Sequence, residues 1–195
     1  MGRYELVRAL WVHRRRPGAP GAAAEQARPP ACSRTNPWVA MSTAGRADNV
    51  IVREATEDDI PRMVELLVHG TLVEGKEDPT DLAPYRSALA EIARGPGAVL
   101  VAEVGGQLVG VCQLIVFRHL QSKGGLCAEV ESVHVHPDYR GHGIGGVLMR
   151  AAVARARDLG CYRLQLTSNN ARPEAHRFYE RLGFEPSHRG FKLSL

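Results

Sequence analysis

Four glycines lie among residues 141–146, directly after Arg140, where a predicted strand meets a predicted helix. The apolar alternation that ends at His136 indicates the strand, and residues 143–160 have the composition of a helix. Glycine allows the backbone to approach a ligand closely. The first N–H groups of a helix have no partner within it and carry partial positive charge. The arrangement predicts a phosphate or pyrophosphate site, although a tight turn without a ligand would need one or two of these glycines.

Two phosphate-binding motifs fit these glycines. Gly141, Gly143 and Gly146 satisfy G-x-G-x-x-G, the dinucleotide fingerprint. That fold requires an acidic residue at the end of the next strand, about twenty residues further on. The next predicted strand, residues 162–168, ends without one, and the chain is too short for a second mononucleotide-binding half. We therefore favour the other motif, Arg140-x-x-Gly143-x-Gly145.

This second motif, with the preceding Val135-His-Pro137, resembles the pyrophosphate loop of the GNAT family of N-acetyltransferases. The resemblance continues through Asn170 and residues 176–184, which are similar to the family's second CoA-binding element. It covers about residues 50–195 and implies acetyl-CoA as co-substrate. The residues that it places in contact with acetyl-CoA are Val133, His134, Val135, Arg140, Gly141, His142, Gly143, Ile144, Gly145, Gly146, Asn170 and Tyr179.

The fold that the resemblance implies is α/β, with a mixed, mostly antiparallel central sheet and helices on both faces. The predicted order of elements, β-α-α-β-β-β-α-β-α-β, agrees with it. In that fold the strand before the glycine loop separates from the strand after the long helix, and the thioester arm enters between them. The last strand of the order is residues 187–195, which alternate in polarity and predict a closing strand.

Acetyl transfer to an amine requires a base for the amine and a proton for the departing thiolate. An alkylamine has a pKa near 10, so about one molecule in a thousand is neutral at pH 7. Glu129 and Glu131 lie two residues apart on a predicted strand and therefore face the same side. The resemblance places both at base positions, with Glu131 as our first choice. A strand bulge could change which of them faces the site, and a solvated pair of carboxylates is the alternative.

Tyr179 matches the family's tyrosine that protonates the CoA sulfur, and His176 lies on the same helix face to support it. The alternative is a packed ring beside Phe178, because neighbouring residues on a helix point different ways and only one of the two rings is expected in the core. Asn170 matches the asparagine that binds the pantetheine arm, or else it caps a helix.

His134 and His136 form an H-x-H pair that could chelate a metal. A metal site needs a third ligand, and none stands nearby in the sequence, so we expect no metal.

The basic character of the chain comes from its first forty residues. They hold seven arginines against Glu5 and Glu25, a net charge of +5, which leaves 18 basic and 19 acidic residues from Met41 onward. The rest of the chain is therefore not basic, and we expect no nucleic-acid partner. No apolar run approaches the roughly 18 residues of a membrane span, and no secretory signal is evident. We expect a cytoplasmic protein without a membrane partner, with a homodimer left open.

Residues 1–47 are rich in Arg, Pro, Ala and Gly and are predicted to be a disordered extension, so the domain is expected at 48–195. The extension weakly resembles a mitochondrial transit peptide, and translation could also begin at Met41.

The substrate is expected to be the primary amine of a small molecule. Glu129 to Val135-x-Pro137, Ala175 to Tyr179 and Ser187-His188 are most similar to small-amine acetyltransferases of the aminoalkylphosphonate type. Two alternatives stay open. One is a protein or peptide acetyltransferase acting on lysine or an N-terminus, and the other is a non-catalytic acyl-CoA-binding regulatory module.

Overall fold

The computed structural model describes residues 49–73 and 75–194. Contacts divide the chain into residues 1–37 and 38–195, and the description below concerns the second unit. The extension expected over residues 1–47 lies outside the described residues.

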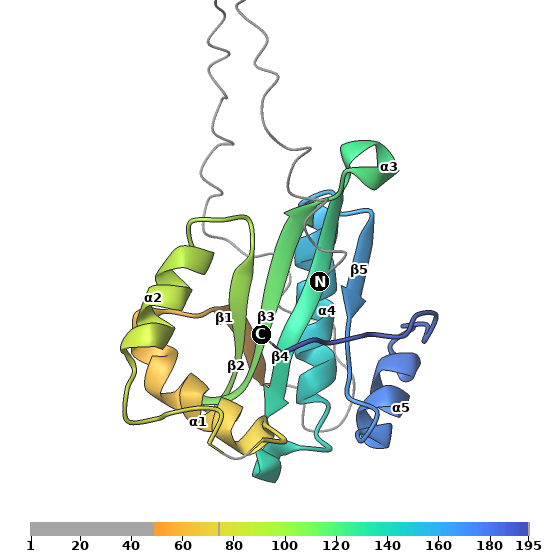
Figure 1. Ribbon diagram of the computed structural model, residues 1–195. Coiled ribbons are helices and arrows are strands. Elements are labelled where there is room, and N and C mark those ends of the chain that lie inside the picture. Colours follow the sequence, from red (N-terminus) through yellow and green to blue (C-terminus); the bar gives the residue numbers. More distant parts are fainter. Residues whose placement is uncertain (1–48, 74, 195) are drawn as a thin grey trace, which may run out of the picture. The chain divides into compact units, whose positions relative to one another are not determined.

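Five strands form one sheet, in the spatial order in which they follow along the chain (Figure 1). β1 to β4 pair antiparallel, and β5 joins β4 in parallel, which confirms the mixed, mostly antiparallel sheet. The β2–β3 hairpin turns on two glycines with positive φ, as a tight primed turn requires. The strands are β1 (Val50–Glu54), β2 (Ala98–Val104), β3 (Gln107–Arg118), β4 (Leu126–Val135) and β5 (Arg163–Leu166).

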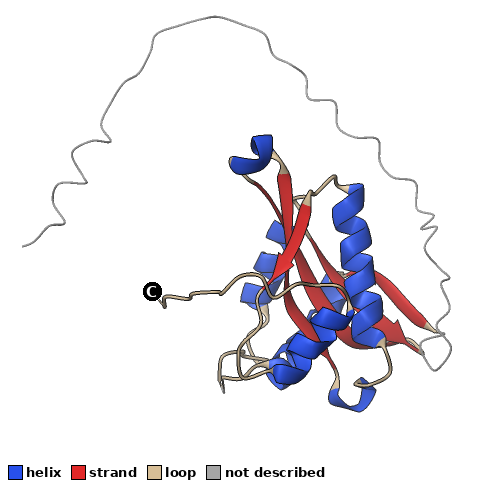
Figure 2. Cartoon of the chain, turned by 90° about the vertical axis from the view of Figure 1, so that its right-hand side faces the viewer, coloured by secondary structure: helices blue, strands red, loops and turns tan. Residues whose placement is uncertain are grey.

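Helices cover both faces of the sheet (Figure 2). Alternation along the strands divides the core: Val101 packs with the helix that begins at Ile60, whereas its neighbour Ala102 packs with Leu148 and Met149 on the other face. The helices are α1 (Ile60–Gly70), α2 (Ala83–Ile92), α3 (Gln121–Gly124), α4 (Ile144–Asp158) and α5 (Pro173–Arg181), with 3-10 turns at Glu57–Asp59 and Pro137–Tyr139. None of the described helices is long and apolar enough to cross a membrane.

A short 3-10 turn after Thr56 leads into α1. The Thr56 backbone N–H donates to the Asp59 carboxylate at 2.7 Å, which completes a capping box. The box caps a 3-10 turn, and α1 proper begins at Ile60. Arg53 pairs with the same carboxylate at 2.7 Å and lowers the pKa of Asp59 to about 2, so β1 is fastened to this turn.

The closing strand predicted over residues 187–195 is wrong. Residues 184–194 form no helix or strand, and the side chains of Phe191 and Leu193 are 92% and 85% exposed. Alternation in a short segment produces a strand only where a neighbouring edge accepts its hydrogen bonds. In the described residues, β5 is only four residues long, and its pairing is with β4.

Candidate active site

β4 divides into two halves that differ in their pairing. Its closed half, residues 127–130, is paired with β5, from Cys127 opposite Arg163 to Val130 opposite Leu166. Its open half, residues 131–135, continues past the last of these pairs. The register against β3 slips in the open half, where Ser132 has φ = 52° and forms a bulge. Pairing between β4 and β5 therefore ends at Val130 and Leu166, near the place where the sequence resemblance implied that the two strands separate.

The glycine-rich segment links the open half to the start of α4. Gly141 and Gly143 have φ near +80°, a conformation that other residues resist, and Gly143 is the N-cap of α4. Since glycine has no side chain to cap the helix, the first N–H groups of α4 remain available to an anion. Arg140 donates from Nε to the Val135 carbonyl at 3.0 Å, which holds its side chain along this segment.

Gly145 has a packing role that the sequence did not reveal. A Cβ at this position would lie 3.2 Å from the Phe178 ring of α5. The absence of a side chain therefore lets α5 approach the beginning of α4, and brings together the two motifs that the sequence resemblance assigns to CoA. Ile144, beside it, is 2% exposed and anchors the first turn of α4 in the core.

The three strand residues expected at the cofactor lie on opposite faces of the open half. Val133 and Val135 pack towards α4, whereas the His134 ring lies against Gly70, where a Cβ would be 1.7 Å from Nδ1. Burial, followed by the nearby Arg172 and Arg140 charges, lowers the pKa of His134 to about 4, so the ring is neutral at pH 7. In the described parts of the chain, no cluster of three or more His, Cys, Asp or Glu residues could hold a metal.

Glu129 and Glu131 both lie on the face of β4 opposite α4, and the bulge comes after them, so it does not separate them. Glu129 accepts a hydrogen bond from Gln165 Nε2 at 2.8 Å, across the β4–β5 pair. Burial raises the pKa of the Glu131 carboxyl, and the charge of Glu129 raises it further, whereas Lys192 opposes the rise. Glu131, at the border between the halves, is thus more basic than an ordinary carboxylate.

Tyr179 reaches the same region from α5. Its ring packs edge-on against Phe178 and Phe184, with centroids 5.1 and 5.9 Å away. Burial raises the pKa of the Tyr179 phenol, Arg172 lowers it, and negative charge on Cys112 or Glu131 raises it. The structure therefore brings the phenol within electrostatic reach of the Glu131 carboxyl.

The expectation that only one ring of Phe178 and Tyr179 would contact the core is wrong. Both are partly buried against the α4 side of the sheet. The reason is that α5 ends at Arg181 and the chain turns back, so that Phe184 adds a third ring around Tyr179.

Asn170 is exposed in the loop after β5. The local hydrogen bonds belong to Asn169, whose side chain accepts from the Ala171 N–H at 2.8 Å and whose carbonyl accepts from the Arg172 N–H at 3.0 Å. His176, expected to support Tyr179, instead meets the Asn169 carbonyl at 3.0 Å through Nε2. The capping interpretation thus applies to Asn169. The Asn170 amide stays at the surface of the loop after β5.

Sequence reasoning missed Arg172 and Lys192. Arg172 donates to the carbonyl of Gly70, the last residue of α1, and Lys192 interacts electrostatically with Glu131 from the C-terminal segment. No motif marks them, since each acts across elements far apart in the chain.

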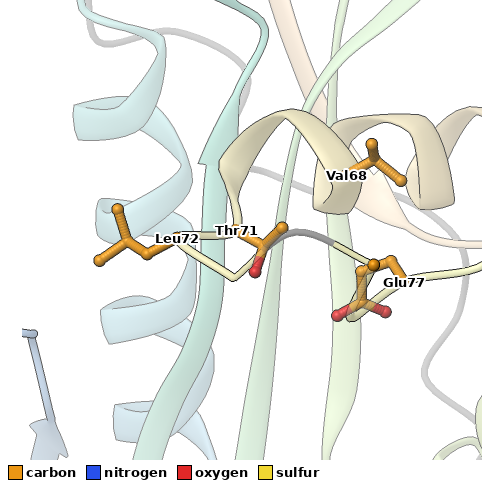
Figure 3. Close-up of a pocket in the computed structure, with 5 residues that line it drawn as sticks. Val68, Thr71, Leu72 and Glu77 are labelled. Atoms are coloured by element: carbon orange, nitrogen blue, oxygen red, sulfur yellow. The ribbon is translucent and has the colours of Figure 1, made fainter.

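A pocket of about 310 Å³ lies at the end of α1 and is lined by Val68, Thr71, Leu72, Gly75 and Glu77. Figure 3 shows Val68 projecting from α1, while Thr71, Leu72 and Glu77 lie on the segment that follows. Glu77 interacts electrostatically with His134, so the pocket is close to the open half of β4.

Comparison with known proteins agrees with this geometry. The family model of the acetyltransferase (GNAT) family matches residues 60–184. Glucosamine 6-phosphate N-acetyltransferase from Trypanosoma brucei brucei is 30% identical over 147 residues, which covers 74% of this chain and 95% of that protein. Aminoalkylphosphonate N-acetyltransferase from Salmonella typhimurium is 30% identical over 145 residues, covering 74% of this chain and 90% of that protein.

Among solved structures, a transcriptional regulator from Bacillus halodurans C-125 superposes with a TM-score of 0.71 at 37% identity, covering 75% of this chain and 100% of that one. The matched family region includes the glycine segment, the open half of β4 and Tyr179. The chain therefore belongs to the acetyltransferase (GNAT) family and is an acetyl-CoA-dependent N-acetyltransferase.

Proposed function

We propose that this enzyme moves the acetyl group of acetyl-CoA directly to the primary amine of a small molecule, at the open half of β4. The observation that carries the proposal is that Glu131 and Tyr179, from different elements, lie within electrostatic reach of each other where β4 continues past its last pair with β5. Glu131 provides a base and Tyr179 an acid, the two groups that thioester aminolysis needs.

The glycine segment fits the pyrophosphate of acetyl-CoA. Two glycines with positive φ precede an α4 start without a side-chain cap, so N–H groups of residues 144–146 are placed to donate to phosphate oxygens. Arg140 supplies positive charge beside them. Residues 133–135 would bind the arm through their backbone, and Asn170 would donate or accept from the surface loop.

The proposed transfer conserves its protons. The Glu131 carboxylate takes a proton from the ammonium of the acceptor, and the freed amine attacks the thioester carbonyl. The carbon–sulfur bond breaks with its electron pair on sulfur, and Tyr179 gives its hydroxyl proton to that sulfur. The nitrogen of the product then loses its extra proton, which restores the Tyr179 phenol through solvent, and Glu131 releases its own proton to water. Because the pKa of Glu131 is raised, it is a stronger base than an ordinary carboxylate and closer to the amine that it must deprotonate.

Amines that carry a phosphate or phosphonate group are the first candidates for the acceptor. The two curated relatives are named for glucosamine 6-phosphate and for aminoalkylphosphonates. Lys192 near Glu131 and Arg172 near Tyr179 supply positive charge on either side of the proposed site. Such charges favour an anionic acceptor over a purely cationic one.

A panel of amines with acetyl-CoA, followed by release of free thiol, tests the proposal. It should contain amino sugar phosphates, aminoalkylphosphonates, uncharged amines, diamines and peptides with a free lysine or N-terminus. We expect turnover with a small amine. Turnover confined to peptides would support the protein-acetylating alternative, and CoA binding without thiol release on any amine would contradict the proposal.

A further inference from the structure

Arg172 joins two elements that lie far apart in the chain, α5 and the end of α1. Its backbone N–H bonds to the Asn169 carbonyl at 3.0 Å, and its own carbonyl accepts from the His176 N–H at 3.1 Å, so it is fixed at the start of α5. Its guanidinium donates to the carbonyl of Gly70 at the end of α1, 102 residues away in the chain. The end of a helix carries partial negative charge, which suits a cation there.

The same guanidinium is electrostatically coupled to two side chains of the site. It lowers the pKa of His134, which is already low because of burial, and it also lowers the pKa of Tyr179 against the effect of burial. His134 is packed on Gly70, the residue that Arg172 holds. Arg172 is the N-cap of α5, and Tyr179 lies seven residues further on, about two helical turns along the same face. Arg172, Gly70, His134 and Tyr179 therefore form one cluster, which spans α1, β4 and α5.

Resting on the function proposed above, we propose that Arg172 is a positioning residue for acetyl transfer, held by the end of α1 so that its charge stands beside Tyr179. A tether alone would need a hydrogen-bond donor and not a charge. Burial, Cys112 and Glu131 all raise the pKa of the Tyr179 phenol, and in the described chain Arg172 is the group that counters them. A donor whose pKa lies far above that of a thiol, about 8.5, gives up its proton less readily.

In the transfer step the proton moves from the Tyr179 hydroxyl to the CoA sulfur. Arg172 neither gives nor takes a proton, since a guanidinium stays charged in proteins. Its positive charge stabilises the negative charge that develops on the phenol oxygen and sulfur as the carbon–sulfur bond breaks.

Three substitutions separate the charge from the hydrogen bond. Arg172→Gln keeps a donor for the Gly70 carbonyl without charge, Arg172→Met removes both, and Arg172→Lys keeps the charge. The matched control is Arg177→Met, an exposed arginine on the same helix that pairs with Glu174. Each variant is measured for CoA affinity, for kcat against pH, and for ionisation of Tyr179, taken as the tyrosinate absorbance difference from the same variant carrying Tyr179→Phe.

We expect the Gln and Met variants to lose roughly tenfold in kcat, less than the 10²–10⁴ attributed to a general acid itself. Their CoA affinity should stay within about twofold, since the charge change lies away from the pyrophosphate site. The sign of the pH effect follows from the charge: Arg172 lowers the pKa of Tyr179, so without it Tyr179 ionises, and kcat falls, at higher pH. Arg172→Lys should keep the pH midpoint of Tyr179 ionisation and the pH midpoint of the fall in kcat. Arg177→Met should change neither midpoint, kcat nor CoA affinity.

Gln and Met variants with unchanged kcat and an unchanged Tyr179 midpoint, but lower thermal stability, would show a structural tether and overturn the inference. If Arg172→Met does not fold, Arg172→Gln decides the question. The absorbance titration needs no acceptor. If no amine is acetylated, the proposed function fails. The Tyr179 titration midpoint still tests the placement of Arg172: a shift in Arg172→Gln supports it, and an unchanged midpoint contradicts it.

Discussion

The closed half of β4 is paired with both β3 and β5. Among the described strands, the open half is paired with β3 alone. Cys127, Ala128 and Val130 in the closed half are at most 1% exposed. The side chains of the open half are half-buried or exposed, and its backbone bulges at Ser132. One strand thus provides a stable core over four residues and then a free edge with titratable side chains over the next five. Substitutions in the two halves should therefore affect different quantities.

The largest expected effect is on cofactor binding next to the open half. Gly143→Glu places a side chain and a negative charge where the pyrophosphate should lie, so the Kd of CoA should rise by more than about 100-fold. Calorimetric titration with CoA measures it. Gly160→Glu, at the other end of α4, is the control, because it imposes the same positive-φ strain with open space around the side chain. Equal CoA affinity in both variants would contradict the site.

Tyr179→Phe should lower kcat on the order of 10²-fold while acetyl-CoA still binds, since the ring stays and the transferable proton is lost. Tyr162→Phe, which changes an exposed ring at the start of β5, should leave kcat unchanged. Steady-state thiol release at saturating acceptor compares them. Normal turnover by Tyr179→Phe would mean that another group or water protonates the thiolate.

Val130→Ala tests the closed half. The side chain is 1% exposed, so its truncation should cost roughly 2 kcal/mol of unfolding free energy. For a chain of this size that corresponds to a fall in Tm of roughly 4–8 °C. Ile51→Ala, at a site 59% exposed on β1, should cost less than about 0.5 kcal/mol. We expect KM and kcat of Val130→Ala to stay within about twofold of the unsubstituted enzyme. A large loss of activity would contradict the expectation that the closed half contributes to stability and not to catalysis.

The smallest effect is expected from the beginning of the chain. A protein that starts at Met41 should keep the Tm and turnover of the full chain, because the Arg-, Pro-, Ala- and Gly-rich composition of the first forty residues is that of a dispensable extension. Thermal unfolding and thiol release measure the two. A clear loss of either would mean that the first forty residues contribute to the domain.

Local patterns predicted most of the fold. The predicted order of elements contained the five strands of the sheet, and the composition of residues 143–160 identified α4. The error at residues 187–195 arose because polarity alternates there without a neighbouring edge to complete a strand. Pattern alone does not specify the partner of a strand.

The site was predictable where one motif held its residues and not where distant segments meet. The sequence placed Glu129 and Glu131 on one face and Gly143 at a helix start. It could not predict that Arg172 reaches Gly70 or that Lys192 approaches Glu131, since these contacts depend on how α1, α5 and the C-terminal segment pack. The packing role of Gly145 against Phe178 was hidden for the same reason.

The most direct test of acetyl transfer at the border of the two halves is the pH dependence of kcat/KM in Glu131→Gln and Glu129→Gln. In the full enzyme kcat/KM should rise with pH as Glu131 loses its proton, at a pH above that of an ordinary carboxyl because burial and Glu129 raise the pKa of Glu131. Glu129→Gln removes one cause of the raised Glu131 pKa. The rising limb of the kcat/KM profile should therefore move to lower pH, while the plateau value at high pH is kept. Glu131→Gln should abolish the limb and lower the plateau by about 10²-fold. An unchanged limb in Glu131→Gln, or its loss in Glu129→Gln instead, would contradict the assignment of Glu131 as the base.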